Sequence, residues 1–240
     1  MSLDRAIRPA RLRLARGLAL NSKTWMQRHT KDVFVKESRQ QGLRARSAFK
    51  LKEIDEKSES LNYSYRAHTT SRHHLIRGNE LVIDIGSSPG GWSVYASERL
   101  KPNLGGACVS VDLLPMDPIP NVHFIQGDFL DPLVQSQIQE AYSNRRADIV
   151  LSDMLHNLTG HRSTDQSRSM NICFAVLDFA GSISAADASL LMKFLRCEED
   201  KELMEEVLLS YSSAKIVKPK ASRGESAEAY ILARGFRKLP

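Results

Sequence analysis

The feature that most constrains the fold is the stretch 81–92, with the sequence LVIDIGSSPGGW. Apolar residues on both sides of Asp84 predict a strand buried on both faces, as in a parallel sheet. Pro89 ends extended structure, and a helix is expected to open at about Trp92. Three glycines in the turn would let bare backbone approach a ligand: Gly86, Gly90 and Gly91. By itself the stretch fits a nucleotide-type turn and an ordinary strand-to-helix turn about equally well.

The turn differs from the two common phosphate-binding patterns. It does not match G-x-G-x-x-G, and Trp92 occupies the place where a triphosphate-binding loop needs its lysine. A ligand that contains adenosine but no phosphate fits this chemistry better. S-adenosyl-L-methionine is the common cofactor of that kind, and it is the cofactor we expect.

The alternation of strands and helices predicts an α/β fold with a mostly parallel, doubly wound sheet and helices on both faces. Seven strands are expected, at about 81–85, 107–111, 122–125, 148–151, 189–194, 215–217 and 228–233. Helices are expected at about 44–57, 92–101, 131–142, 170–184 and 198–213.

Charged side chains gather at the predicted carboxyl ends of the strands, where open α/β sheets bind ligands. They are Asp84, Asp112, Asp128, Asp153 and Lys193. Asp112 is placed to accept hydrogen bonds from a ribose, although a nicotinamide cofactor would use an acid in the same place. Asp128 could accept from an adenine amino group or could simply be a turn residue. Lys193 lies in an apolar strand and must emerge at an edge, pair with a carboxylate or lose its proton, and Asp153 is the natural partner.

Composition predicts one domain at 31–240, with a polar insertion at about 59–78 in which His73 and His74 are expected to be solvated. No apolar run approaches the roughly 18 residues of a membrane span, and no cluster of metal ligands is apparent. Residues 1–30 contain seven basic residues and one acidic residue, interleaved with apolar ones. This pattern predicts a leader of the mitochondrial presequence type.

Seven short motifs, taken together, resemble the FtsJ (RrmJ) family. They lie at 47–51, 84–92, 112–119, 126–129, 152–154, 218–219 and 226–230, and the resemblance covers about residues 27–236. It implies a Rossmann-like, S-adenosyl-L-methionine-dependent methyltransferase fold whose last strand is antiparallel. The implied activity is methylation of a ribose 2′-hydroxyl in ribosomal RNA, and the run 112–128 is similar to the large-subunit rRNA branch.

The resemblance also implies particular residues. The catalytic set maps onto Lys50, Asp153, Lys193 and Glu228. We expect cofactor contacts at Asp84, Gly86, Pro89, Gly90, Gly91, Trp92, Asp112, Leu113, Asp128, Phe129 and Asp153. The implied target is a uridine of large-subunit rRNA within a ribosomal particle, bound by a monomeric enzyme. With the leader, the predicted location is the mitochondrial matrix, the alternative being the cytoplasm.

Positive charge in the segments 31–50 and 215–238 predicts a surface for RNA phosphates. The candidates are Lys36, Arg39, Arg44, Arg46, Lys218, Lys220 and Arg223. Four stretches depart from the family pattern: Ser87-Ser88 in the glycine turn, the long segment 59–78, Leu155-His156 after the fourth strand and Phe194-Leu195-Arg196 after Lys193. They concern the substrate side of the predicted site.

Three other readings remain at this stage. A methyltransferase acting on tRNA, a protein or a small molecule would share the cofactor edge. A non-catalytic ribosome-assembly factor could retain the fold. A nicotinamide-dependent oxidoreductase would give no reason for Lys50 or Glu228.

Overall fold

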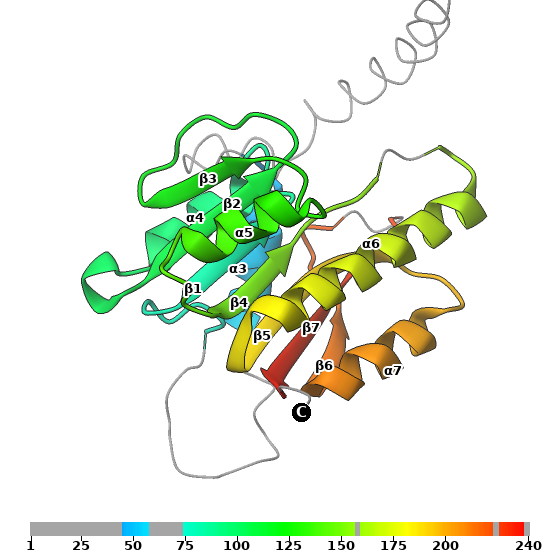
Figure 1. Cartoon of the computed structure of the whole chain (residues 1–240). Helices are drawn as coiled ribbons and strands as arrows, with labels where there is room; N and C mark the ends of the chain where they lie inside the picture. Colours follow the sequence, from blue (N-terminus) through cyan, green and yellow to red (C-terminus); the bar gives the residue numbers. More distant parts are fainter. Residues whose placement is uncertain (1–44, 58–73, 157–158, 223–225, 238–240) are drawn as a thin grey trace, which may run out of the picture.

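The computed structural model describes residues 45–57, 74–156, 159–222 and 226–237. A seven-stranded sheet, in the order β3-β2-β1-β4-β5-β7-β6, forms its centre (Figure 1). The strands are β1 (Leu81–Ile85), β2 (Ala107–Asp112), β3 (Val122–Gln126), β4 (Ala147–Ser152), β5 (Ser184–Leu195), β6 (Tyr211–Val217) and β7 (Glu228–Phe236). Strands β1 to β5 pair in parallel, whereas β7 is antiparallel to both β5 and β6. The predicted sheet is therefore confirmed.

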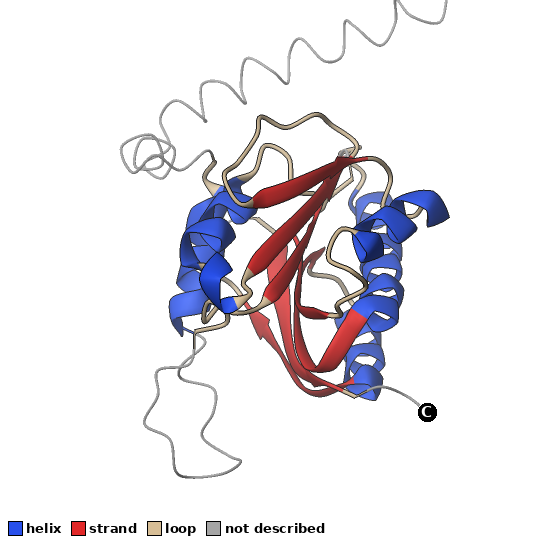
Figure 2. Ribbon diagram, turned by 60° about the vertical axis from the view of Figure 1, so that its left-hand side comes forward, coloured by secondary structure: helices blue, strands red, loops and turns tan. Residues whose placement is uncertain are grey.

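Helices cover both faces of the sheet (Figure 2). They are α3 (Ser47–Lys57), α4 (Gly91–Arg99), α5 (Pro132–Glu140), α6 (Arg162–Ile183) and α7 (Asp200–Ser210), with a short 3-10 helix at Pro102–Leu104. One core cluster joins α3 and α4 to the sheet, through side chains such as Leu51 and Tyr95. The other includes side chains from α5, α6 and α7, such as Ile138 and Val176. Each helix hides one apolar stripe against strands that are apolar on both faces, which is why β1 is buried throughout.

Three predicted starts are wrong: that of β5, which begins at Ser184 and not near 189, and two others that have a clear physical cause. Helix α6 begins at Arg162, not near 170, because its polar first turns still bury Asp165 and Ser169. Strand β6 begins at Tyr211, which had been placed in the preceding helix. The Tyr211 side chain is fully buried, and its ring lies 5.3 Å from that of Phe236. In both places the tertiary contacts decided where the element starts.

The predicted leader and most of the predicted insertion lie outside the described residues. The end of that insertion is part of the packed domain, since Leu75 and Ile76 are buried. His74, expected to be solvated, has its Nδ1 atom 3.2 Å from a carboxylate oxygen of Asp55. Among the described residues, no helix is long and apolar enough to cross a membrane. In the same part of the chain, no three His, Cys, Asp or Glu side chains are grouped so as to hold a metal ion.

Asp55 anchors α3 to its neighbours. Its carboxylate is completely buried and accepts hydrogen bonds from the Ile76 backbone N–H at 2.9 Å and the Tyr95 hydroxyl at 2.7 Å. Arg99 of α4 completes the cluster, with Nε 3.2 Å from the same carboxylate. A buried charge is tolerated only when it is paired in this way. The cluster therefore fixes α3 against α4 and against the segment that leads into β1.

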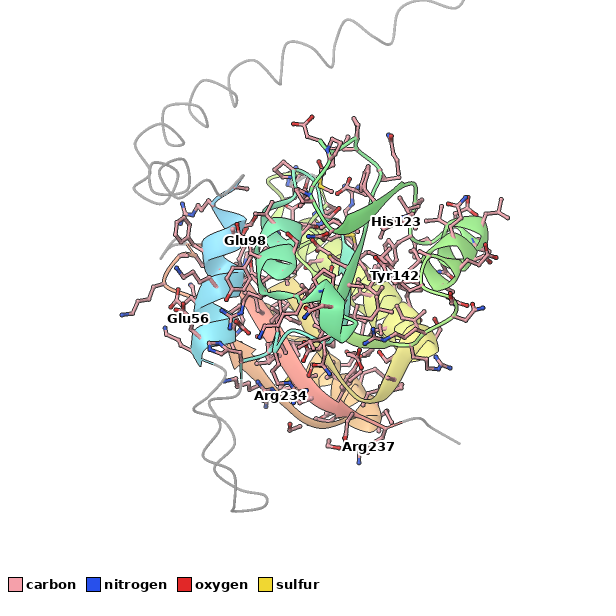
Figure 3. All side chains as sticks on the ribbon, turned by 90° about the vertical axis from the view of Figure 1, so that its left-hand side faces the viewer. Glu56, Glu98, His123, Tyr142, Arg234 and Arg237 are labelled. Carbon is pink, nitrogen blue, oxygen red and sulfur yellow. The ribbon has the colours of Figure 1, made fainter. Side chains whose placement is uncertain are left out.

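Replacing Asp55 by Ala should lower the free energy of unfolding by about 3–5 kcal/mol, because Arg99 and the buried donors lose their acceptor. Urea unfolding measures this. Glu98→Ala is the matched control, since Glu98 is an exposed carboxylate on the adjacent helix (Figure 3), and it should change stability by about 0.5 kcal/mol or less. Equal small losses in the two variants would contradict the anchoring role.

Candidate active site

Lys193 and Asp153 meet at the carboxyl edge of the sheet, as the sequence predicted. Lys193 is near the end of β5, and Asp153 directly follows β4, the parallel neighbour of β5. The Lys193 Nζ atom lies 3.1 Å from Asp153 Oδ1 and also donates to the Asp153 backbone carbonyl. Lys193 is only 9% exposed, so this carboxylate compensates a charge that has little access to water.

Lys50 and Glu228 form a second ion pair. Lys50 projects from α3 and Glu228 is the first residue of β7, and their side chains approach to 3.0 Å. Lys50 is 8% exposed, although a helical lysine would normally extend into solvent. The residues are 178 positions apart in the sequence, so only the packing of α3 on the sheet joins them.

Tyr230 connects the two ion pairs, and it was not among the predicted site residues. Its hydroxyl donates to Asp153 Oδ1 at 2.8 Å, while Lys50 Nζ lies 5.7 Å from the centre of its ring. Burial and the charge of Asp153 raise the pKa of Tyr230, so the phenol stays protonated and donates. The sequence signal was the spacing of Glu228 and Tyr230, which places both on one face of a strand.

The strand register explains why these groups converge. In the antiparallel pair β5–β7, Lys193 is opposite Tyr230 and Leu195 is opposite Glu228. Residues opposite each other share a face of the sheet, and Tyr230 packs in the core cluster beneath α3 and α4. Lys193, Tyr230 and Glu228 therefore all point toward the face that α3 covers. That helix brings Lys50 to the same place.

Asp84 lies beneath the glycine turn and is fully buried. Its Oδ2 atom accepts from the Ser93 hydroxyl at 2.6 Å, whereas its buried Oδ1 atom has no hydrogen-bond partner among the described residues. Burial raises the pKa of Asp84 to about 7. The Ser93 hydrogen bond opposes this shift, and the charges of Asp153 and Asp112 add to it. A cationic group beside this carboxylate would satisfy the unpaired oxygen and favour its ionised form.

The turn itself is shaped by close packing. Gly86 has φ +73°, and a Cβ atom there would lie 2.0 Å from Cγ of Met154. The next strand contributes Asp112, whose two carboxylate oxygens accept from the backbone N–H groups of Ser88 and Leu114, each at 2.8 Å. Asp112 therefore holds the loop at the end of β2 against the turn. It is half-buried at the edge of the sheet, where the sequence expected a ribose contact.

Other predicted cofactor residues take different positions. The Trp92 side chain is 2% exposed, its indole N–H donates to the Ser47 carbonyl at 2.9 Å, and its ring lies 5.7 Å from that of Tyr230. The Trp92 ring therefore packs against the Tyr230 ring. The Phe129 side chain packs in the core against Phe179. The remaining edge positions, Pro89, Leu113 and Asp128, are exposed, and Gly90 and Gly91 are buried where α4 begins.

The loop after Asp153 is held by one carboxylate. Asp165 of α6 accepts from the Thr159 N–H and hydroxyl, each at 2.8 Å, and lies 3.1 Å from His156 Nε2. The Thr159 N–H makes the largest contribution to lowering the pKa of Asp165 from its usual value. At the departure from the family pattern at Leu155-His156, the histidine therefore contacts a carboxylate of α6.

The predicted RNA-binding residues fall into three groups. Lys36, Arg39, Arg44 and Arg223 lie outside the described residues. Arg46 donates from Nε and Nη2 to the Ala221 carbonyl, so the structure gives it a role in docking α3 on the β6–β7 connection. Lys218 and Lys220 are exposed, and Lys218 also donates to the Ser226 carbonyl at 2.9 Å.

Comparison with known proteins identifies the family. Residues 43–236 match the family model described as FtsJ-like methyltransferase. The chain belongs to the FtsJ-like methyltransferase family. It is 38% identical over 216 residues to "Ribosomal RNA large subunit methyltransferase E" of Legionella pneumophila, covering 90% of this chain and 97% of that one. The protein of the same name from Rhodopseudomonas palustris is 36% identical over 221 residues, covering 92% and 87%.

A solved structure shares the fold of this FtsJ-like chain. A Plasmodium falciparum protein described as a ribosomal RNA methyltransferase has a TM-score of 0.65 at 25% identity, covering 80% of this chain and 98% of that chain. Human methyltransferase-like protein 13 superposes with a TM-score of 0.51 at 10% identity, covering 69% and 77%, and this likeness concerns the fold alone.

The residues of this FtsJ-like site fit S-adenosyl-L-methionine. The cofactor carries a sulfonium and an ammonium but no phosphate, and three carboxylates surround the glycine turn: Asp84, Asp112 and Asp153. The unpaired Oδ1 of Asp84 is a buried acceptor in that region. A phosphate ligand would meet repulsion here, whereas a cationic ligand would be attracted.

The raised pKa of Asp84 predicts how the stability of the protein changes with pH. Because folding raises this pKa from 3.8 to about 7, the native state binds the extra proton between these values, and stability without ligand falls as pH rises through that window. Asp84→Asn should remove that fall and be more stable than the parent above pH 7, by an amount on the order of a few kcal/mol. It should also lose the rise in S-adenosyl-L-methionine affinity that the parent shows across the same pH range.

Urea unfolding and calorimetric titration on both sides of neutral pH measure these two effects. Asp178→Asn is the control, since Asp178 is an exposed carboxylate on α6 and its loss should leave both pH profiles unchanged. Parallel stability profiles for the parent and Asp84→Asn would contradict the buried-acid account.

Proposed function

We propose that this protein uses S-adenosyl-L-methionine to methylate a ribose 2′-hydroxyl, that of a uridine, in large-subunit ribosomal RNA. The observation that carries the proposal is the arrangement of two carboxylate-paired ammonium groups around Tyr230, beside the glycine turn. The names of the relatives, which specify large-subunit rRNA, support the substrate. The ribose and uridine assignments rest on the motif resemblance.

Methyl transfer requires mainly that the hydroxyl be oriented and that the developing negative charge be stabilised. S-adenosyl-L-methionine supplies an electrophilic methyl group, so the enzyme must position a hydroxyl and help to remove its proton. Lys193 is held by two oxygens of Asp153, and it can donate a hydrogen bond to the oxygen as negative charge develops there. Lys50 supplies a second positive charge on the other side of Tyr230. The paired carboxylates keep both cations in place in a nearly buried site.

The RNA would enter along the surface beside α3. Lys218 and Lys220 lie on the β6–β7 connection that α3 contacts, where they can bind phosphates. We propose that the substrate is met within a large-subunit particle and that the enzyme acts as a monomer.

Lys193→Ala should reduce methyl transfer by at least about 10²–10⁴-fold, because the charge that assists the 2′-hydroxyl is lost. Its affinity for S-adenosyl-L-methionine should stay within a few-fold of the parent. Radiolabelled methyl transfer to large-subunit rRNA and calorimetric cofactor binding provide the two measurements. Lys201→Ala, which removes an exposed lysine from α7, should retain full activity.

The same variant separates catalysis from a purely structural role in assembly. If a Lys193→Ala protein with normal cofactor binding restored both rRNA methylation and subunit assembly in cells that lack the parent, the catalytic assignment would be wrong. Restored assembly without methylation would support the assembly-factor alternative.

We also propose a mitochondrial location, supported by the seven basic residues and single acidic residue within 1–30. Fusion of residues 1–30 to a fluorescent reporter should direct the reporter to mitochondria. A matched fusion in which the arginines are replaced by glutamine should remain in the cytosol. Cytosolic retention of the unmodified fusion would favour the cytoplasmic alternative.

A further inference from the structure

Arg234 of β7 carries a charge that the described part of the protein leaves unpaired. Its Nε and Nη2 atoms are both buried, and neither has a hydrogen-bond partner. These two atoms form the edge of the guanidinium that binds carboxylate and phosphate through two parallel hydrogen bonds. Arg46 uses the same edge, but on the Ala221 carbonyl. Buried donors without acceptors are costly, so a ligand that supplies two oxygens would be favoured here.

The strand register places Lys215 beside Arg234. In the β6–β7 pair Lys215 is opposite Leu232, and Ser213 is opposite Arg234. Leu232 and Arg234 are two residues apart and so share a face, the one on which Leu232 packs beneath α3 and α4. Lys215 and Arg234 are therefore neighbours on that face. Burial and the charge of Arg234 lower the pKa of Lys215 to about 8, which reflects the same proximity.

The acidic groups nearby are already engaged. Asp55 accepts from the Ile76 N–H and the Tyr95 hydroxyl and pairs with Arg99. Glu80 pairs with Arg77. The pKa of Arg234 is lowered first by its own burial and then by the charge of Arg77. No side-chain hydrogen bond or ion pair connects Lys215 or Arg234 to the described residues. The charge of Asp55 raises the pKa of Arg234, but within that part of the chain no carboxylate accepts a hydrogen bond from the buried Nε and Nη2 atoms.

We propose that Arg234 and Lys215 form a binding site for a phosphate-class oxyanion, occupied in the working enzyme by a phosphate of the RNA backbone. At about 3.4 Å per residue, Arg234 lies roughly 20 Å along β7 from Glu228, away from the reaction centre. The site would hold RNA at a distance from the methylated nucleotide and contribute affinity without taking part in methyl transfer. Only the source of the phosphate rests on the proposed function.

Arg234→Met tests the site, with Arg237→Met as its control on the same strand end (Figure 3). Arg237 is exposed and donates to the carbonyls of Leu208 and Tyr211, so its replacement removes an arginine without touching the proposed site. In phosphate-free buffer, Arg234→Met should melt at or above the parent temperature, because an unpaired buried charge is removed. Inorganic phosphate or pyrophosphate should raise the melting temperature of the parent and of Arg237→Met, but not that of Arg234→Met.

The RNA arm identifies the source of the phosphate. For an rRNA fragment, the slope of log affinity against log salt should decrease by about one for Arg234→Met and stay unchanged for Arg237→Met. Loss of the phosphate response with an unchanged RNA slope would keep the site but overturn RNA as its ligand. A phosphate response equal to that of the parent, together with a lowered melting temperature, would overturn the site itself. The melting-temperature measurements with phosphate require no methyl transfer, so they test the site even if the proposed function is wrong.

Discussion

The burial of two ammonium groups in one charged cluster around Tyr230 is the constraint on which the rest of this structure depends. Lys50 and Lys193 are each less than a tenth exposed, and each is stable there only because a carboxylate lies about 3 Å away. Tyr230 lies between the pairs and ties one of them to the sheet through Asp153. A site of this kind must be assembled before the substrate arrives, because an unpaired charge in the same place would be costly.

Assembly of that site requires α3 to dock accurately on the sheet. Asp55 ties α3 to α4 and to the approach to β1, while Arg46 and Glu53 contact the carbonyl and the N–H of Ala221 on the β6–β7 connection. Lys50 lies between Glu53 of the same helix and Arg46, the residue directly before that helix. The energy that holds the four charged groups is therefore spread over contacts outside their cluster, which is how a rigid scaffold supports a preorganised site.

Much of this could be predicted from local patterns, and the errors have identifiable causes. Apolar runs with Asp84, Asp153 or Lys193 at or near their carboxyl ends showed the strands and the ligand edge, because the carboxyl ends of parallel strands meet at one side of a sheet. Tyr230 was overlooked because an aromatic residue in an apolar strand is typical of a core position. Arg46 was taken for an RNA ligand because a helix pattern does not show that a distant carbonyl lies opposite it. The start of α6 was misplaced because its polar first turns bury Asp165.

The sequence by itself determined the fold class, the glycine turn and the acidic cofactor edge, since each depends on residue types at short spacing. The four charged residues of the predicted catalytic set came from the resemblance of separate motifs to the FtsJ family. Only the tertiary structure decided which charges pair. Lys50 could have met any carboxylate at that edge, and the docking of α3 over β7 selects Glu228. The same holds for Arg234, whose isolation depends on the β6–β7 register and on acids already engaged elsewhere. Long-range pairing is a property of packing geometry, and no local pattern in the chain encodes it.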